Sequence, residues 1–179
     1  QRMGSEYGFA VESLATVQDG GARISSTRIR DALQRGDLEH AEQCLGRRYR
    51  ICGRVGHGHK RGRTIGFPTM NVPLLRRSTP LRGVFAVQAI GLGDQPLPGV
   101  ANIGNRPTLE GDDRFLLEVH LFDFSADVYG KAVEVDFVER IRDEHKFESF
   151  DALRQQIQRD VRAARKILGL APLEQSGTA

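Results

Sequence analysis

The stretch RFLLEVHLFDF, residues 114–124, decides the fold, because its side chains alternate in a strand-like pattern. Successive side chains of an extended strand point to opposite faces. One face of this strand is purely apolar, whereas the other mixes polar and apolar residues and includes Glu118 and His120. The alternation predicts a strand with one face in a core. The apolar set is Phe115, Leu117, Val119 and Leu121.

Five further runs have the composition of strands and are separated by Gly, Pro, Asp and Asn residues. Residues 94–99 and 110–113 have the composition of hairpin loops. Six strands with short connections and no helix between them predict an antiparallel barrel or sandwich. The five runs are residues 49–55, 64–72, 83–92, 97–104 and 132–141.

A long helix is expected after the strands. Ser149 is its predicted cap, Gly169 ends it, and its apolar residues recur every three or four positions. This stripe is expected to pack on the barrel, and residues 171–179 are expected to form a disordered tail. The stripe consists of Phe150, Leu153, Ile157, Val161, Ala164 and Leu168.

The first segment, residues 1–46, has a different pattern. We expect a short strand over residues 7–17, a turn at 19–23 and two short helices. One strand and two helices cannot enclose a core, so the segment is expected to belong to a larger α/β unit. The predicted caps and ends are Ser26 or Thr27 with Gly36 for the first helix, and Asp37 with Gly46 for the second.

Composition restricts the classes of function. The chain has 179 residues, of which 39% are hydrophobic and 27% charged, and no apolar run is long enough to span a membrane. The net charge of +3 is too small to indicate nucleic-acid binding by itself. Basic residues cluster in 46–63 and 74–82, which favours a local anion site. Cys44 and Cys52 lack a CxxC spacing, no secretory signal is apparent, and we expect a reducing cytoplasm.

Residues 53–71, GRVGHGHKRGRTIGFPTMN, combine five glycines with several basic side chains. Glycines allow backbone N–H groups to approach a phosphate closely. Thr69 and Asn71, two residues apart on one face, have the right chemistry for a phosphate and its metal. The spacing is not that of a P-loop. A glycine-rich hairpin with solvated basic residues remains the alternative.

Two other features allow both a functional and a structural interpretation. Glu118 is either a general base or a carboxylate on a solvated or paired face. Arg142, His145 and Phe147 either stack on a planar heterocycle or form a helix-entry loop in which Phe147 packs as a staple. The HGH motif at 57–59 lacks accompanying cysteines or carboxylates, so no structural zinc site is expected.

Taken in order, these motifs closely resemble bacterial riboflavin kinases over residues 47–169. The resemblance is carried by residues 53–72, 83–87, 99–108 and 117–153 and by the final helix. It implies a mainly β fold, a six-stranded antiparallel Greek-key barrel with a C-terminal α-helix. It also implies transfer of the γ-phosphate of ATP to the ribityl 5′-hydroxyl of riboflavin, giving FMN and ADP, with Mg²⁺ as cofactor.

The resemblance further implies roles for individual residues. Glu118 would be the catalytic base. The flavin side would be formed by Arg142, His145 and Phe147. ATP binding would fall to Gly58, Gly62, Arg63, Thr69 and Asn71, of which Thr69 and Asn71 would also hold Mg²⁺.

Residues 1–46 resemble the end of the FMN adenylyltransferase domain that precedes the kinase domain in bifunctional bacterial enzymes, with ISSTRIR at 24–30. The HxGH-type signature of that domain is absent. We therefore expect a domain remnant at 1–46, a kinase domain at 47–170, and no adenylyl transfer by this chain. Interface surface exposed on the remnant would favour self-association.

Three alternatives stay open at this point. The first is a flavin sensor that binds the ligand without phosphorylating it. The second is a basic barrel that binds single-stranded nucleic acid, although the sequence has no Trp and only 7% aromatic residues. The third is a folded but inactive fragment.

Overall fold

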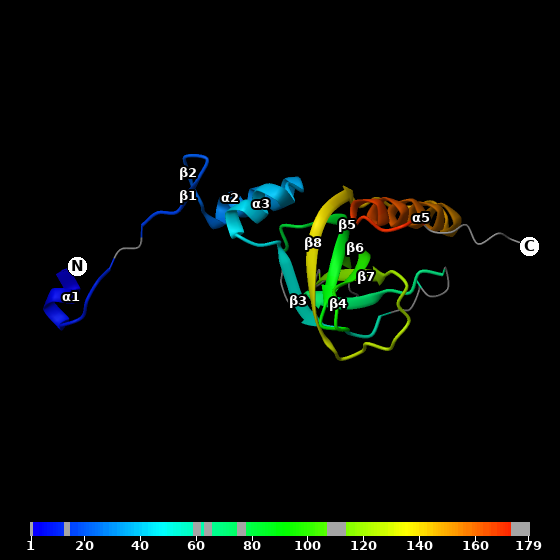
Figure 1. Cartoon of the computed structure of the whole chain (residues 1–179), viewed down its shortest axis with the longest axis horizontal. Coiled ribbons are helices and arrows are strands. Elements are labelled where there is room, and N and C mark those ends of the chain that lie inside the picture. Colours follow the sequence, from blue (N-terminus) through cyan, green and yellow to red (C-terminus); the bar gives the residue numbers. More distant parts are fainter. Residues whose placement is uncertain are drawn as a thin grey trace, which may run out of the picture.

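In a computed structural model of the chain, residues 2–12, 15–58, 62, 66–74, 78–106 and 114–172 are described. Six strands in this part form one antiparallel sheet, and helix α5 follows them (Figure 1). The predicted strands are therefore confirmed. Their bounds are β3 Arg50–Arg54, β4 Met70–Leu74, β5 Gly83–Ile90, β6 Leu97–Arg106, β7 Arg114–Leu121 and β8 Ala132–Arg142.

The largest difference from the predicted strand boundaries is at the start of β4. Strand β4 begins at Met70, later than expected, because Gly66 adopts a turn conformation with φ of 85° and Pro68 has no N–H for a ladder. Strand β6 begins at Leu97, as its predicted run does, so the loop expected at 94–99 ends before Leu97. The loop expected at 110–113 lies outside the described residues.

The sheet order is β3-β8-β5-β6-β7-β4. Strands β5, β6 and β7 follow one another, and β8 returns to lie beside β5, which is the Greek-key order. The two ends of the sheet meet at β3 and β4. A Cβ added to Gly53 of β3 would clash with the Val72 side chain of β4, and the Gly56 N–H donates to the Asn71 carbonyl at 2.7 Å. These contacts nearly close the barrel.

The barrel interior is filled by the apolar faces of the strands. Phe115, Leu117 and Val119 of β7 are at most 4% exposed, whereas the alternate residues Glu118 and His120 lie on the outer face and are half-buried. The alternation that predicted this strand is confirmed residue by residue. The outer face is consequently available for a site.

Helix α5, Phe150–Ile167, covers the outer face of β5 and β6 (Figure 1). The Ser149 hydroxyl accepts from the Ala152 N–H at 3.1 Å, which confirms the predicted cap. Val161 and Ala164 pack on the sheet as expected, but Phe150 is 68% exposed. The predicted stripe is wrong at that end, because the first turns of the helix extend over a cavity. No helix of the described chain is both long and apolar enough to cross a membrane.

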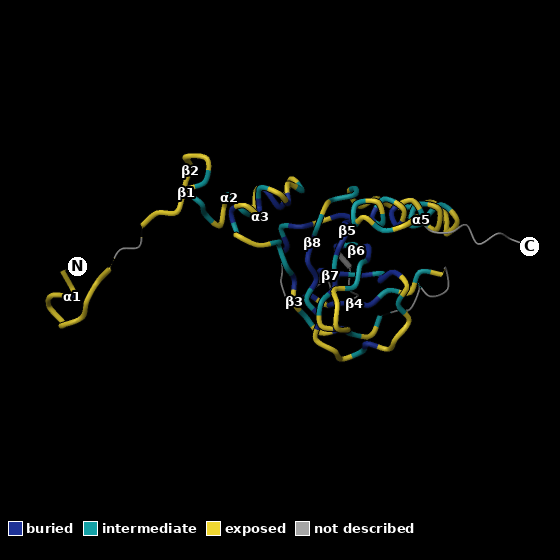
Figure 2. The backbone as a smooth tube through the Cα atoms, viewed as in Figure 1, coloured by how far each residue is buried: buried dark blue, intermediate teal, exposed yellow. Residues whose placement is uncertain are grey.

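The strand predicted over residues 7–17 is wrong for the described residues of that range. Helix α1 occupies Arg2–Tyr7, and the following segment is extended without a neighbouring strand (Figure 1). A strand needs a paired neighbour, and none reaches this segment. Phe9, Val11 and Val17 of this segment therefore stay exposed, and the tube there is coloured mainly as exposed (Figure 2).

The remaining elements of the first segment are a hairpin and two helices. Strands β1 (Gln18–Asp19) and β2 (Ala22–Arg23) enclose the predicted turn, and helices α2 (Ser26–Arg35) and α3 (Leu38–Leu45) follow. The cap of α2 is Ser25 instead of Ser26 or Thr27, because its hydroxyl accepts from the Arg28 N–H. The cap Asp37 and the helix ends Gly36 and Gly46, with φ of 76° and 69°, are confirmed.

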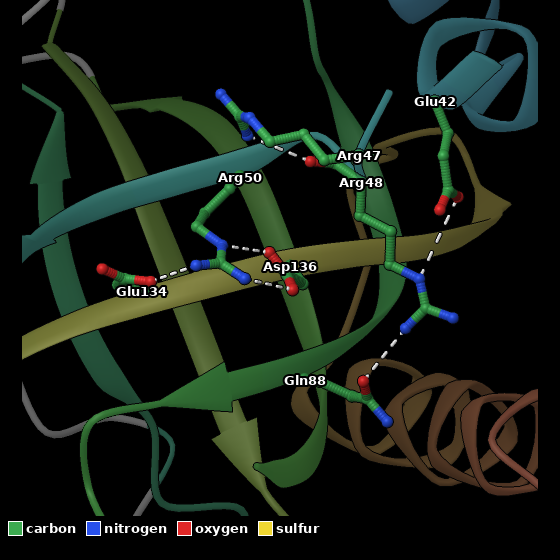
Figure 3. A network of polar contacts seen from close by, with 7 residues as sticks. All are labelled: Glu42, Arg47, Arg48, Arg50, Gln88, Glu134 and Asp136. Atoms are coloured by element: carbon green, nitrogen blue, oxygen red, sulfur yellow. Dashed lines mark hydrogen bonds and ion pairs between the residues drawn. The ribbon is translucent and has the colours of Figure 1, made fainter. Parts of the chain in front are cut away.

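Helices α2 and α3 share the core of the barrel. Ala32, Leu33, Leu38 and Ala41 belong to the same buried cluster as the barrel interior. Polar contacts reinforce the junction (Figure 3). Arg48 lies between Glu42 of α3, at 4.0 Å, and Gln88 of β5, at 3.0 Å. The two helices are thus fixed to the barrel by both apolar and polar contacts.

The same region contains an ion-pair cluster on the barrel wall (Figure 3). Arg50 of β3 pairs with Asp136 and Glu134 of β8. The hydrogen bond to Asp136 is the main cause that raises the pKa of Arg50. The two cysteines are free thiols: Cys44 of α3 is buried, and Cys52 of β3 is exposed.

We expect Gly53→Ala to lower the free energy of unfolding by about 1–3 kcal/mol, because the new methyl group overpacks the seam against Val72. Gly93→Ala is the matched control, since no neighbouring heavy atom lies within 4 Å of its added Cβ. Urea denaturation measures both variants. Equal effects at the two positions would contradict this account of barrel closure.

Candidate active site

A cavity of about 470 Å³ lies on the outer face of the barrel. Its floor is formed by β4, β7, β6 and the start of β5. Its walls are the first half of α5 and the loop at 143–149. Most of the residues that the sequence singled out face this cavity, as described below.

Three polar residues form a row across the cavity floor. In the strand register, Glu118 of β7 is paired with Asn71 of β4 on one side and with Asn102 of β6 on the other. All three line the cavity. Directly paired residues of neighbouring strands have adjacent side chains. We call Asn71, Glu118 and Asn102 the polar row.

Glu118 is half-buried at the centre of this row. A carboxylate in that position can accept a proton from a group bound in the cavity. The interpretation of Glu118 as part of a fully solvated face does not fit its position. Asn71 is more deeply buried, at 6% exposure.

The end of the cavity next to α5 is aromatic and cationic. The Arg142 guanidinium lies 5.7 Å from the centre of the Phe147 ring. The centre of the His145 ring lies 4.2 Å from the same point. Arg142 also donates to His145 Nδ1 at 3.2 Å. The three residues predicted for this side are therefore brought together, and Phe150 adds apolar surface beside them.

Arg142 is held by Asp160 of α5, a residue that the sequence analysis missed. Its Nε and a terminal nitrogen donate to the two carboxylate oxygens at 2.9 and 2.8 Å. The Asp160 side chain is only 4% exposed and also accepts from Gln156 at 2.9 Å. A buried carboxylate needs such partners. The one sequence signal was a charge directly beside Val161 of the apolar stripe.

The glycines of the basic loop lie against the other end of the polar row. A Cβ added to Gly58 would clash with the Asn71 side chain. A Cβ added to Gly62 would clash with the Phe67 carbonyl and would lie 3.4 Å from Thr69 Oγ1. Only glycine allows the backbone this close. Arg63, the predicted cationic member of the loop, lies outside the described residues.

A second cavity of about 480 Å³ adjoins the first. Thr69 lines both cavities and therefore marks their junction. The walls of the second cavity are mainly apolar side chains of β4 and β7 and of residues 124–129. His57 stacks on Tyr129 with ring centres 4.3 Å apart at its edge. Sequence spacing contained no signal for this cavity, because its walls come from three separate segments.

His120 links the cavity floor to the segment before β4. Its Nδ1 donates to the Pro68 carbonyl at 2.8 Å, and its ring contacts Phe67 and Phe122. Burial lowers the pKa of His120, although the Pro68 carbonyl opposes this shift. Because the Pro68 carbonyl can only accept, Nδ1 carries a proton, and this hydrogen bond fixes Pro68 beside Thr69.

Two groups of residues have metal-binding chemistry in the described part of the chain. Asp19, His40 and Cys44 bring their ligand atoms within 4.8 Å of one another. The Arg28 guanidinium already donates to His40 at 3.0 Å and to Asp19 at 2.8 Å, so this group does not fit a metal ion. The hydroxyl of Thr69 and the amide oxygen of Asn71 are hard ligands on one face, which suits Mg²⁺.

Comparison with known proteins agrees with this geometry. Residues 45–168 match the flavokinase family model, described as riboflavin kinase. The bifunctional riboflavin kinase/FMN adenylyltransferase of Escherichia coli K12 is 52% identical over 170 residues, covering 95% of this chain and 54% of that protein. The Bacillus subtilis protein of the same description is 46% identical over 157 residues, with 86% and 48% coverage. The chain spans about half the length of these relatives.

A solved structure is also similar. A crystal structure from Streptococcus pneumoniae, described as a macrolide-efflux protein, is 41% identical with a TM-score of 0.71. The match covers 81% of this chain and 47% of that one. This similarity supports the same fold over most of the chain.

We expect His120 to make the fold less stable as the pH falls. The folded pKa is lowered, so the unfolded chain binds the proton more readily, and stability declines as the pH drops through the unfolded value of about 6.5. His120→Asn retains a donor for Pro68 but does not titrate. Urea unfolding at pH 7.5 and 5.0 should show a larger loss for the wild type than for the variant. Identical losses would contradict a lowered pKa.

Proposed function

Because this chain belongs to the riboflavin kinase family, we propose that it transfers the γ-phosphate of ATP to the ribityl 5′-hydroxyl of riboflavin. The products are FMN and ADP. The observation that carries the proposal is the position of Glu118. It lies between the aromatic end of the first cavity and Thr69 at the junction with the second.

The aromatic end of the first cavity suits the flavin ring. Phe147 and Phe150 offer faces for an isoalloxazine, and Leu153 and Ile157 of α5 add apolar surface. Arg142 supplies a cation whose direction is fixed by Asp160. His145 completes the predicted flavin-binding set through its contacts with Arg142 and Phe147.

The second cavity suits the nucleotide. Its apolar walls fit an adenine ring, and its junction at Thr69 leads to the polar row. Gly58 and Gly62 leave backbone next to Asn71 and Thr69, where phosphates would lie. Arg63 would add a planar, permanently charged group to the same loop.

Thr69 and Asn71 would hold Mg²⁺ through their side-chain oxygens. Held there by these two residues, Mg²⁺ would neutralise charge on the phosphate oxygens. The hydrogen bond from His120 to Pro68 supports this arrangement, because it fixes the backbone next to Thr69.

Glu118 accepts the proton of the 5′-hydroxyl group. At the same time, the oxygen of this hydroxyl group forms a bond to the γ-phosphorus. The bond between that phosphorus and the bridging oxygen breaks, and ADP leaves with the electron pair. Positioning and charge stabilisation supply most of the acceleration in phosphoryl transfer. The polar row performs the positioning at the acceptor end.

The direct test is an assay of the purified chain with riboflavin, ATP and Mg²⁺, followed by chromatographic separation of FMN and FAD. We expect FMN and no FAD from this 179-residue chain, which contains the ISSTRIR motif but no HxGH signature. Flavin binding without ATP consumption would instead indicate a flavin-binding module.

The two free cysteines and the use of ATP fit a cytoplasmic enzyme.

Glu118→Gln is expected to lower kcat by about 10²–10⁴-fold, because the amide cannot accept the proton. The KM for riboflavin should change far less, since the amide has nearly the same shape. Glu139→Gln on β8 is the matched control, because Glu139 is an exposed strand residue that does not line the cavity. Turnover of Glu118→Gln near that of the wild type would exclude the role as base.

A further inference from the structure

Asn102 is the member of the polar row that has no part in the chemistry proposed above. It lies on β6, between β5 on one side and Glu118 of β7 on the other. Helix α5 contacts β5 and β6, so the outer face runs from α5 across Asn102 to Glu118 and then to Asn71. A chain that joins a ring beside α5 to a reacting group at Glu118 must cross Asn102.

The orientation of the Asn102 amide is set by Glu144. The amide nitrogen donates to a Glu144 carboxylate oxygen at 3.1 Å. An ionised carboxylate only accepts hydrogen bonds, so the nitrogen must face Glu144 and the amide oxygen must point elsewhere. Glu144 reaches this place because residue 104 is glycine, where an added Cβ would clash with the carboxylate.

The amide oxygen of Asn102 is shielded from solvent and has no hydrogen-bond donor among the described residues. Buried polar atoms in native proteins are nearly always paired, and an unpaired one is unfavourable. The residue lines the first cavity, so a ligand that binds there and displaces the side chains covering this oxygen can supply the missing donor. A hydroxyl group is a suitable donor, because it can also accept from neighbouring groups.

We propose that Asn102 binds an inner hydroxyl of the ribityl chain and that Glu144 is a positioning residue that orients its amide. The proposal rests on the proposed function, because it takes riboflavin as the substrate. Neighbouring strands lie about 5 Å apart, a separation that a five-carbon chain can span. The terminal hydroxyl then lies at Glu118 while an inner hydroxyl lies over β6. The site therefore selects for the hydroxylated side chain as well as for the flavin ring.

The test compares flavin binding by Asn102→Ala and by the wild type, measured by fluorescence titration without ATP. The ligands are riboflavin and three analogues that each lack one inner hydroxyl. We expect Asn102→Ala to weaken riboflavin binding roughly 3- to 10-fold, the usual range for one hydrogen bond. The analogue that lacks the hydroxyl bound by Asn102 should bind the variant and the wild type equally well, because neither protein can form that hydrogen bond with it. In turnover, KM should rise while kcat stays within about 2-fold.

Further variants at Gln88 and Glu144 separate binding from folding. Gln88→Ala removes an amide that pairs with Arg48 outside the cavity, and it should bind all four ligands as the wild type does. Glu144→Ala should weaken riboflavin binding, and Glu144→Gln, which keeps an acceptor for the Asn102 amide, should restore it. If Asn102→Ala does not fold, Asn102→Ser is compared in the same way.

The proposal is overturned if the Asn102 variant weakens riboflavin and all three analogues by the same factor, or weakens none of them. Failure of the proposed function has a different signature. In that case the wild type binds flavin but forms no FMN, and the comparison of analogues still decides the role of Asn102. A wild type that binds no riboflavin overturns both proposals.

Discussion

The close approach of β3 and β4 is the constraint on which the rest of the structure depends. Gly53 lets Val72 fill the seam, and Gly56 continues the pairing as far as Asn71. This seam turns the sheet into a barrel and buries Asn71 at the edge of the candidate site. The glycines between residues 53 and 62 therefore serve barrel closure, and in the proposed function they would also let the backbone approach the phosphates. The two sequence interpretations of the loop, as a turn and as a phosphate cradle, are compatible.

The sequence predicted the strands well because a period of two is a local property. Alternation in residues 114–124 assigned Glu118 to the outer face, and the structure agrees. The polar row could not be predicted in the same way. Its members lie at positions 71, 102 and 118 and become neighbours only through the strand register. Glu118 and Asn71 were singled out by their local pattern and received their expected roles from the resemblance, whereas Asn102 had no local signal of its own.

The errors in prediction have a common physical cause. Patterns of apolar residues indicate that a face will be covered but not what covers it. Among the described residues, the apolar segment after Tyr7 has no partner strand, so it does not become a strand. The apolar stripe of α5 leaves the sheet at Phe150, where it borders a cavity. Asp160 was missed for the converse reason, since its partner Arg142 lies on another element.

The shared core of the barrel and of helices α2 and α3 has a consequence for cooperativity. The family match begins at residue 45, but Leu33, Leu38 and Ala41 are buried in the same cluster as the strands. The smallest unit that melts in a single calorimetric transition therefore begins near Ser25, some twenty residues before the boundary of the family match. Proteolysis within α2 or α3 would consequently expose barrel core instead of releasing an independent appendage.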